Sequence, residues 1–170
     1  METSPERLVM LEILGLPAHI LFLHAVVVLS PVAALTGLVY ALRPSWGRIL
    51  EGPAVVLAVL AAGFTLLTAS AGEALQHALP SDPLIEAHAE QGGLLEVSAA
   101  LFTGAVLVLV VMTGPWISRK TPFLTRLRHT RWLVITVRVL VVLAAVWMIY
   151  QVAVTGHSGA QAVWTNWRTS

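Results

Sequence analysis

The side chains in this sequence best suited to ligand chemistry are histidines that gather near the ends of its apolar runs. Imidazole nitrogens bind transition metals and haem iron, and beside acids they can pass protons. Five of the 6 histidines fall at the same end of four apolar runs, and each run contributes at least one. This sorting predicts one shared binding site, and unconnected polar residues at an interface are the alternative. The five are His19, His24, His77, His88 and His157.

Four polar side chains fall within the apolar runs rather than at their tips. At ~1.5 Å per helical residue, they lie roughly 6 to 12 Å below the run ends. Polar groups inside a membrane are costly and are usually kept for function. We therefore expect them to share one buried layer, below a shallower ring formed by the other histidines. The four are His24, Glu73, Glu96 and Gln151.

Helical spacing decides which of these residues can act together. Glu73 and His77 are four positions apart and share one helix face. His19 and His24 are five apart and point roughly 140° away from each other, so they should not hold one ion together.

The elements that carry these residues are membrane-spanning helices. The chain is 57% hydrophobic and 11% charged, with a mean hydropathy of +0.82, which is typical of an integral membrane protein rather than a soluble domain. Four apolar runs, about 18–42, 53–79, 88–112 and 132–155, each reach the roughly 20 residues that a span requires. Short connections predict an all-α, four-helix transmembrane bundle in up-down-up-down order, a single domain over 1–170.

The absence of cysteine limits the chemistry. Disulfides, thiolate metal sites, iron–sulfur clusters and thioether-bound haem are excluded, so any metal must use nitrogen or oxygen ligands. Hydrolytic triads, phosphate loops and dinucleotide fingerprints are also missing, and whether the protein is an enzyme stays open.

Charges sort to opposite ends of the predicted bundle. Eight of the 10 cations belong to one end, which the positive-inside rule assigns to the cytoplasm. Eight of the 9 acids, both termini and the histidine cluster belong to the other, extracytoplasmic end. The basic loops are expected to contact anionic lipid, and no nucleic acid is expected as a partner. These cations are Arg43, Arg48, Arg119, Lys120, Arg126, Arg128, Arg131 and Arg138.

Four segments resemble a known family. LPAHILFLHAVV at 16–27, AGEAL at 71–75, EAHAEQG at 86–92 and TGHSGAQAVW at 155–164 are similar to the bacterial membrane family called domain of unknown function 2231, in its actinobacterial form. The resemblance implies four transmembrane helices and a bacterial inner membrane. The resemblance implies no established activity. Some relatives carry fused cytochrome or Rieske-like domains, and this association favours electron transfer. Carried over position by position, the motifs of the family indicate His19, His24, Glu73, His88 and His157 as the candidate site residues.

The first functional hypothesis is a membrane redox protein with b-type haem. Histidines projecting inward from different helices hold haem iron without cysteine. His24, the deepest, is the expected first ligand, with His88 or His157 as the second and His19 at the propionates or outer rim. A redox partner or larger membrane complex would then exchange electrons at the outer surface.

Two alternatives stay open beside haem. His24, Glu73 and Glu96, joined by His88 or His157 and with His77 nearby, could hold zinc, iron, copper or manganese, or relay protons. The chain could instead be a non-catalytic accessory subunit of a membrane complex. Self-association into a homo-oligomer is also left open.

Overall fold

The computed structural model describes residues 12–13, 16–120 and 130–165, with side chains at 16–117 and 130–165. It confirms the all-α class, because helices make up nearly all of this part of the chain. A pair of two-residue strands, β1 (Glu12–Ile13) and β2 (Leu16–Pro17), precedes them. The long helices are α2 (Ala18–Leu42), α3 (Gly47–Ala78), α4 (Pro83–Thr113) and α7 (Arg131–Trp164), with short helices η1 (Pro44–Trp46) and α5 (Pro115–Lys120).

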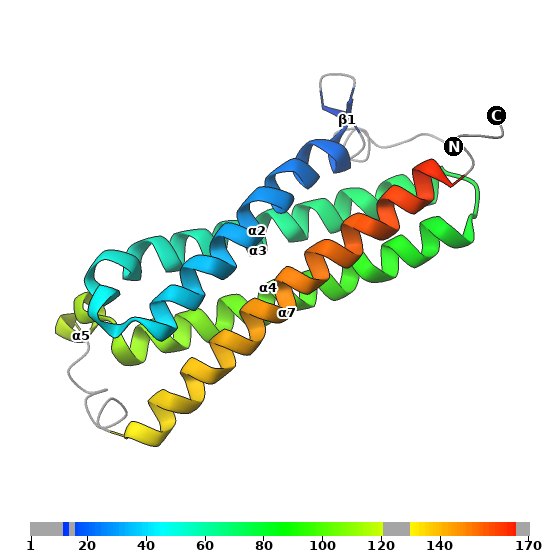
Figure 1. The fold of residues 1–170 in the computed structure, drawn as a ribbon. Coiled ribbons are helices and arrows are strands. Elements are labelled where there is room, and N and C mark those ends of the chain that lie inside the picture. The colour runs from blue at the N-terminus through cyan, green and yellow to red at the C-terminus, as the bar shows by residue number, and fades with distance from the viewer. Residues whose placement is uncertain (1–11, 14–15, 121–129, 166–170) are drawn as a thin grey trace.

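The four long helices form a bundle of two closely packed pairs. α2 packs chiefly against α3, and α4 against α7, while α2 and α4 lie diagonally across the bundle. α2 and α4 run towards the end that carries α5, and α3 and α7 run back from it (Figure 1). We call the end with η1 and α5 the basic end, and the end where α2 begins and α7 finishes the histidine end.

Local sequence signals explain where the helices begin and end. The Asp82 carboxylate accepts a hydrogen bond from the Leu84 backbone N–H at 2.7 Å, and Pro83 occupies the first helical position. Aspartate before the helix and proline at its first position both favour a helix start. α4 therefore begins five residues before the apolar run that opens at His88.

Three of the helices are longer than the apolar runs that predict them. α3 starts at Gly47 and continues through Pro53, and α7 continues past Thr155 to Trp164. An apolar run marks the part of a helix that suits hydrocarbon, whereas hydrogen bonding continues through polar residues outside it. At 34 residues, α7 is roughly 51 Å long and exceeds a hydrocarbon core of about 30 Å.

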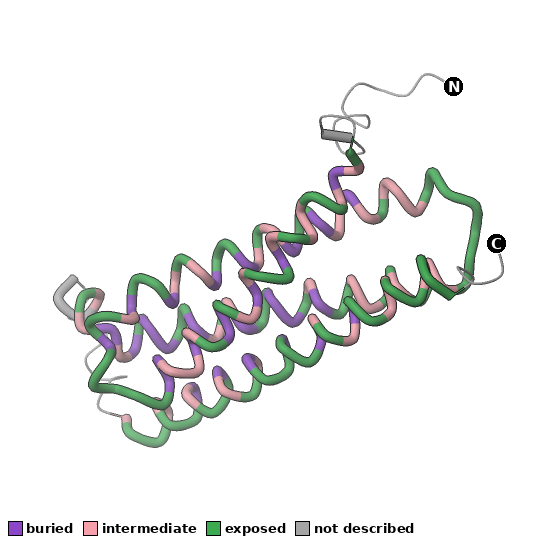
Figure 2. Tube along the Cα trace, turned by 45° about the horizontal axis from the view of Figure 1, so that its top comes forward, coloured by how far each residue is buried: buried purple, intermediate pink, exposed green. Residues whose placement is uncertain are grey.

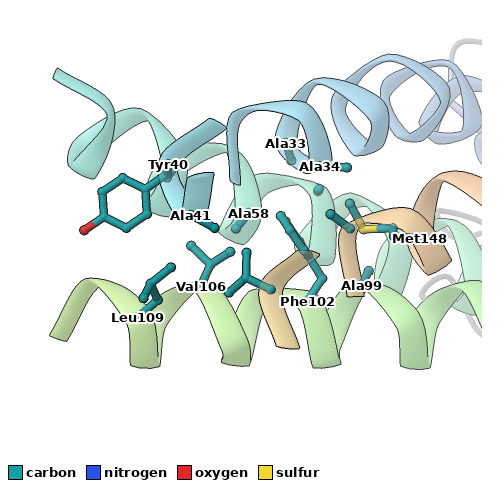
Figure 3. Close-up of a cluster of buried hydrophobic side chains, with 14 of the residues drawn as sticks. Ala33, Ala34, Tyr40, Ala41, Ala58, Ala99, Phe102, Val106, Leu109 and Met148 are labelled. Carbon is teal, nitrogen blue, oxygen red and sulfur yellow. The ribbon is translucent and has the colours of Figure 1, made fainter. Parts of the chain in front are cut away.

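The buried core between the pairs combines small residues with large ones. Ala33 and Ala34 of α2 and Ala58 of α3 are fully buried opposite Phe102 of α4 and Met148 of α7 (Figure 3). A Cβ on Gly37 would lie 2.7 Å from the Phe102 ring. Small residues on one pair thus leave room for the large side chains of the other, which permits close helix approach.

Large apolar side chains also cover the outside of the bundle. Most of the outward helix surface is exposed in Figure 2, and it carries residues such as Leu101 and Leu143 at 64% and 60% exposure. All four long helices are long and apolar enough to cross a membrane. An apolar exterior around an apolar core is the arrangement expected for helices in lipid.

Candidate histidine site

His19 is held in the first turn of α2 by the neighbouring helix α3. Its Nδ1 lies 2.8 Å from the backbone oxygen of Thr68. A Cβ on Gly72, one turn further along α3, would lie 2.9 Å from the same nitrogen. The imidazole therefore occupies the space that the absent side chain of Gly72 leaves open.

His88 is held in an equivalent manner within the second helix pair. Its Nδ1 lies 3.0 Å from the Ser158 hydroxyl of α7, which donates to the Thr155 carbonyl at 2.9 Å. A Cβ on Gly159 would lie 3.0 Å from the His88 ring. The Thr155 hydroxyl donates to the Gln91 carbonyl at 3.1 Å and ties α7 to α4 at this level.

The two histidines meet between the helix pairs. Their ring centroids are 6.2 Å apart, and the rings are nearly perpendicular at 84°. Both side chains are part-buried. The contact joins α2 to its diagonal neighbour α4, while Gly72 and Gly159 come from the other two helices, so all four long helices contribute to the site.

The hydrogen-bond partners define the tautomer of each neutral imidazole. A carbonyl can only accept, so the Nδ1 of His19 carries a hydrogen and donates it to Thr68. The only hydroxyl hydrogen of Ser158 is donated to Thr155, so this hydroxyl accepts from the Nδ1 of His88. Both Nε2 atoms therefore keep a lone pair, the state in which histidine binds a metal.

The structure does not bring His24 to this pair. Its ring is exposed, and its Nδ1 lies 2.7 Å from the Ile20 backbone oxygen of its own helix. The five-residue spacing explains the result, because turning His19 inward turns His24 outward.

The expected buried polar layer is not formed. Of its four members only Gln151 is buried, Glu96 is part-buried, and Glu73 is exposed together with His24. The remaining candidates, His77 and His157, are also exposed. His129, expected at the opposite end, lies outside the described residues.

No group of three or more histidine, aspartate and glutamate side chains suited to a metal ion occurs among the described residues. Below the pair, two buried polar atoms, Ser30 Oγ and Gln151 Nε2, have no hydrogen-bond partner in this part of the chain.

Comparison with protein families matches residues 15–167 to the model described as "Predicted membrane protein (DUF2231)". The chain belongs to this family. The match confirms the resemblance drawn from the four sequence segments, and it covers every residue of the histidine pair and its supports. No curated protein and no solved structure matches this DUF2231 chain.

Sequence reasoning about the DUF2231 chain missed one buried acid at the basic end. Glu51 is only 5% exposed, and its two carboxylate oxygens accept the backbone N–H groups of Trp116 at 2.9 Å and Ile117 at 3.0 Å. It thereby anchors the start of α5. The available signal was that Glu51 is the one acid that does not sort to the histidine end.

Proposed function

We propose that this protein is a membrane redox protein that binds b-type haem through His19 and His88. The observation that carries the proposal is the proximity of these two imidazoles from different helices, with ring centroids 6.2 Å apart. Each is oriented through its Nδ1, which leaves Nε2 for iron. This assignment gives His19 the ligand role that sequence reasoning placed on His24.

The number of donors favours haem over a bare metal ion. A protein-bound zinc or similar ion usually takes three or four protein ligands. A porphyrin supplies four nitrogens itself, so two imidazoles would suffice to hold its iron. Two neighbouring histidines suit the second case better, because no group of three or more metal-binding side chains occurs among the described residues.

The spacing of the two rings also suits this cofactor. Two imidazoles that would hold one iron, each through Nε2 at about 2 Å, have ring centroids at most about 6 Å apart. The 6.2 Å centroid separation is close to that requirement. Gly72 and Gly159 leave room on α3 and α7 for the two imidazoles themselves, which holds both rings at the same level.

The protein's own residues would orient the ligands and limit access by water. Thr68 and Ser158 would hold the two ring planes and tautomers. Bound haem would supply one-electron redox chemistry. Gln151 and Ser30 offer buried polar atoms deeper in the bundle than the pair.

The proposed orientation places the histidine end outside the cytoplasm of a bacterium, in its inner membrane. Arg43, Arg48, Arg131 and Arg138 all lie at the basic end of the described chain. Cations favour the cytoplasmic side of short loops. Electrons would then pass to or from a redox partner at the outer surface.

Absorption spectra of the purified protein, expressed with haem supplied, test the proposal. We expect a Soret band at near one haem per chain. His19→Ala and His88→Ala should each lose haem or change its spin state, because one of the two histidines that would hold the iron is gone. His24→Ala and His157→Ala are matched controls at the same end of the bundle and should keep the wild-type spectrum.

Two results would contradict this function. A wild-type protein with neither haem nor metal in near-stoichiometric amount would favour an accessory subunit that only packs in a complex. Loss of the spectrum in His24→Ala, with retention in His19→Ala, would show that another histidine pair binds the cofactor.

A further inference from the structure

A second polar site lies at the basic end, far from the histidines. It is a cavity of about 240 Å³ where the α2–α3 turn, the start of α5 and the first turns of α7 meet. Its polar lining consists of two arginines and three hydroxyl groups. These are Arg48, Arg138, Tyr40, Ser45 and Thr113.

The two arginines give the cavity an excess of positive charge. Arg138 is part-buried, and its Nε is fully buried without a hydrogen-bond partner among the described residues. Guanidinium groups donate hydrogen bonds and accept none, so this nitrogen requires an acceptor from elsewhere. The buried acid nearby, Glu51, is already bonded to the backbone of α5 through both oxygens.

The hydroxyl groups on the cavity wall are arranged in a chain that leads away from it. Thr113 donates to the Leu109 carbonyl at 2.8 Å, so the Tyr40 hydroxyl must donate in its 3.2 Å bond to Thr113. Tyr40 is 4% exposed and forms a fixed wall. The donors left for a ligand are the two guanidinium groups and the Ser45 hydroxyl.

Three tryptophans place this cavity at the height of lipid headgroups. Trp46, Trp116 and Trp132 are all more than half exposed, and all lie at the basic end. Tryptophans enriched at a helix end mark the membrane–water interface. Arg138 lies six residues beyond Trp132 on α7, roughly 9 Å towards the membrane interior, where a charge needs a counter-charge.

We infer that this cavity binds the phosphate group of an anionic lipid. Two guanidinium groups from different helices can bind phosphate oxygens with paired hydrogen bonds, which suits arginine better than lysine. Because the exposed tryptophans lie at the same end as the cavity, a lipid phosphate would enter it while the acyl chains stay against the apolar helix surface. Binding there would join α2, α3 and α7 at the basic end.

Thermal unfolding of the full chain in lipid nanodiscs tests this inference. We expect a higher Tm in phosphatidylcholine with phosphatidylglycerol than in phosphatidylcholine alone. Arg138→Gln and Arg48→Gln should each weaken the apparent lipid affinity roughly tenfold, as loss of a charge-assisted hydrogen bond predicts. Arg43→Gln and Arg131→Gln remove exposed arginines that lie at the same end but outside the cavity lining. These two substitutions should leave the apparent lipid affinity unchanged.

The comparison with these controls decides between a site and diffuse attraction. Equal weakening by all four substitutions would overturn the inference, because surface charge alone would explain it. A Tm increase of the same size with inorganic phosphate in phosphatidylcholine nanodiscs would assign the cavity to a soluble phosphate instead. Arg48→Gln keeps the test valid if Arg138→Gln does not fold.

Discussion

His19 and His88 meet with ring centroids 6.2 Å apart, although their helices lie diagonally across the bundle. Each imidazole is fixed within its own helix pair, His19 by α3 and His88 by α7. The contact between them therefore joins the two pairs at the histidine end. Substitutions that disturb either support should act on the same site.

Gly72→Ala should displace His19 and lower the haem content without unfolding the protein. The new Cβ would lie 2.9 Å from the His19 Nδ1, so the ring must move away from the Thr68 carbonyl. Gly156→Ala is the control, because a Cβ there meets nothing within 4 Å. Haem-to-protein ratios of the two variants measure the effect, and equal ratios would argue against the role of Gly72.

Ser158→Ala should weaken cofactor binding without abolishing it. The hydroxyl accepts from the Nδ1 of His88, and loss of such an orienting partner typically costs about 10- to 100-fold in affinity. Haem titration of the cofactor-free protein measures this change. Thr136→Ala, which removes a hydroxyl bonded to its own helix at the basic end, should bind as the wild type does. An unchanged affinity in Ser158→Ala would show that His88 needs no support from α7.

Glu51→Gln should destabilise the bundle at its basic end. The amide keeps one acceptor oxygen but presents an NH₂ group to the second backbone N–H of α5. Loss of one hydrogen bond to a charged group corresponds to about 1.5 to 3 kcal/mol. Denaturant titration in detergent measures the free energy of unfolding, with exposed Glu90→Gln as the control. Matching values for the two variants would contradict the anchoring role.

Gly37→Ala should destabilise the core between the helix pairs. Its Cβ would lie 2.7 Å from the Phe102 ring, and such overpacking typically costs about 1 to 3 kcal/mol. Adding Phe102→Leu should recover part of the loss, because a smaller side chain relieves the contact. Gly63→Ala, with nothing within 4 Å of the new Cβ, should be neutral. Independent, additive effects at positions 37 and 102 would rule out the steric explanation.

Single cysteines can test the proposed orientation, because the chain has none of its own. Ser81→Cys in the exposed α3–α4 turn should react with a membrane-impermeant maleimide in intact cells. Ser45→Cys at the exposed basic end should react only after permeabilisation. The opposite labelling pattern would place the histidine end in the cytoplasm.

The number and approximate positions of the membrane helices could be predicted from the sequence, because hydropathy is a property of consecutive residues. The clustering of His19 and His88 at one end follows in the same way from their places in the apolar runs. The five-residue spacing of His19 and His24 also predicted that the two would not hold one ion together, but it did not show which of them faces inward.

Tertiary packing alone decided that His19 faces inward and that it meets His88. The helices are apolar around their circumference, so no polar stripe in the sequence marks the face that turns inward. Their rotation follows instead from close contacts such as Gly72 against His19, Gly159 against His88 and Gly37 against Phe102. These contacts join residues distant in sequence, and only packing of the four helices brings them together.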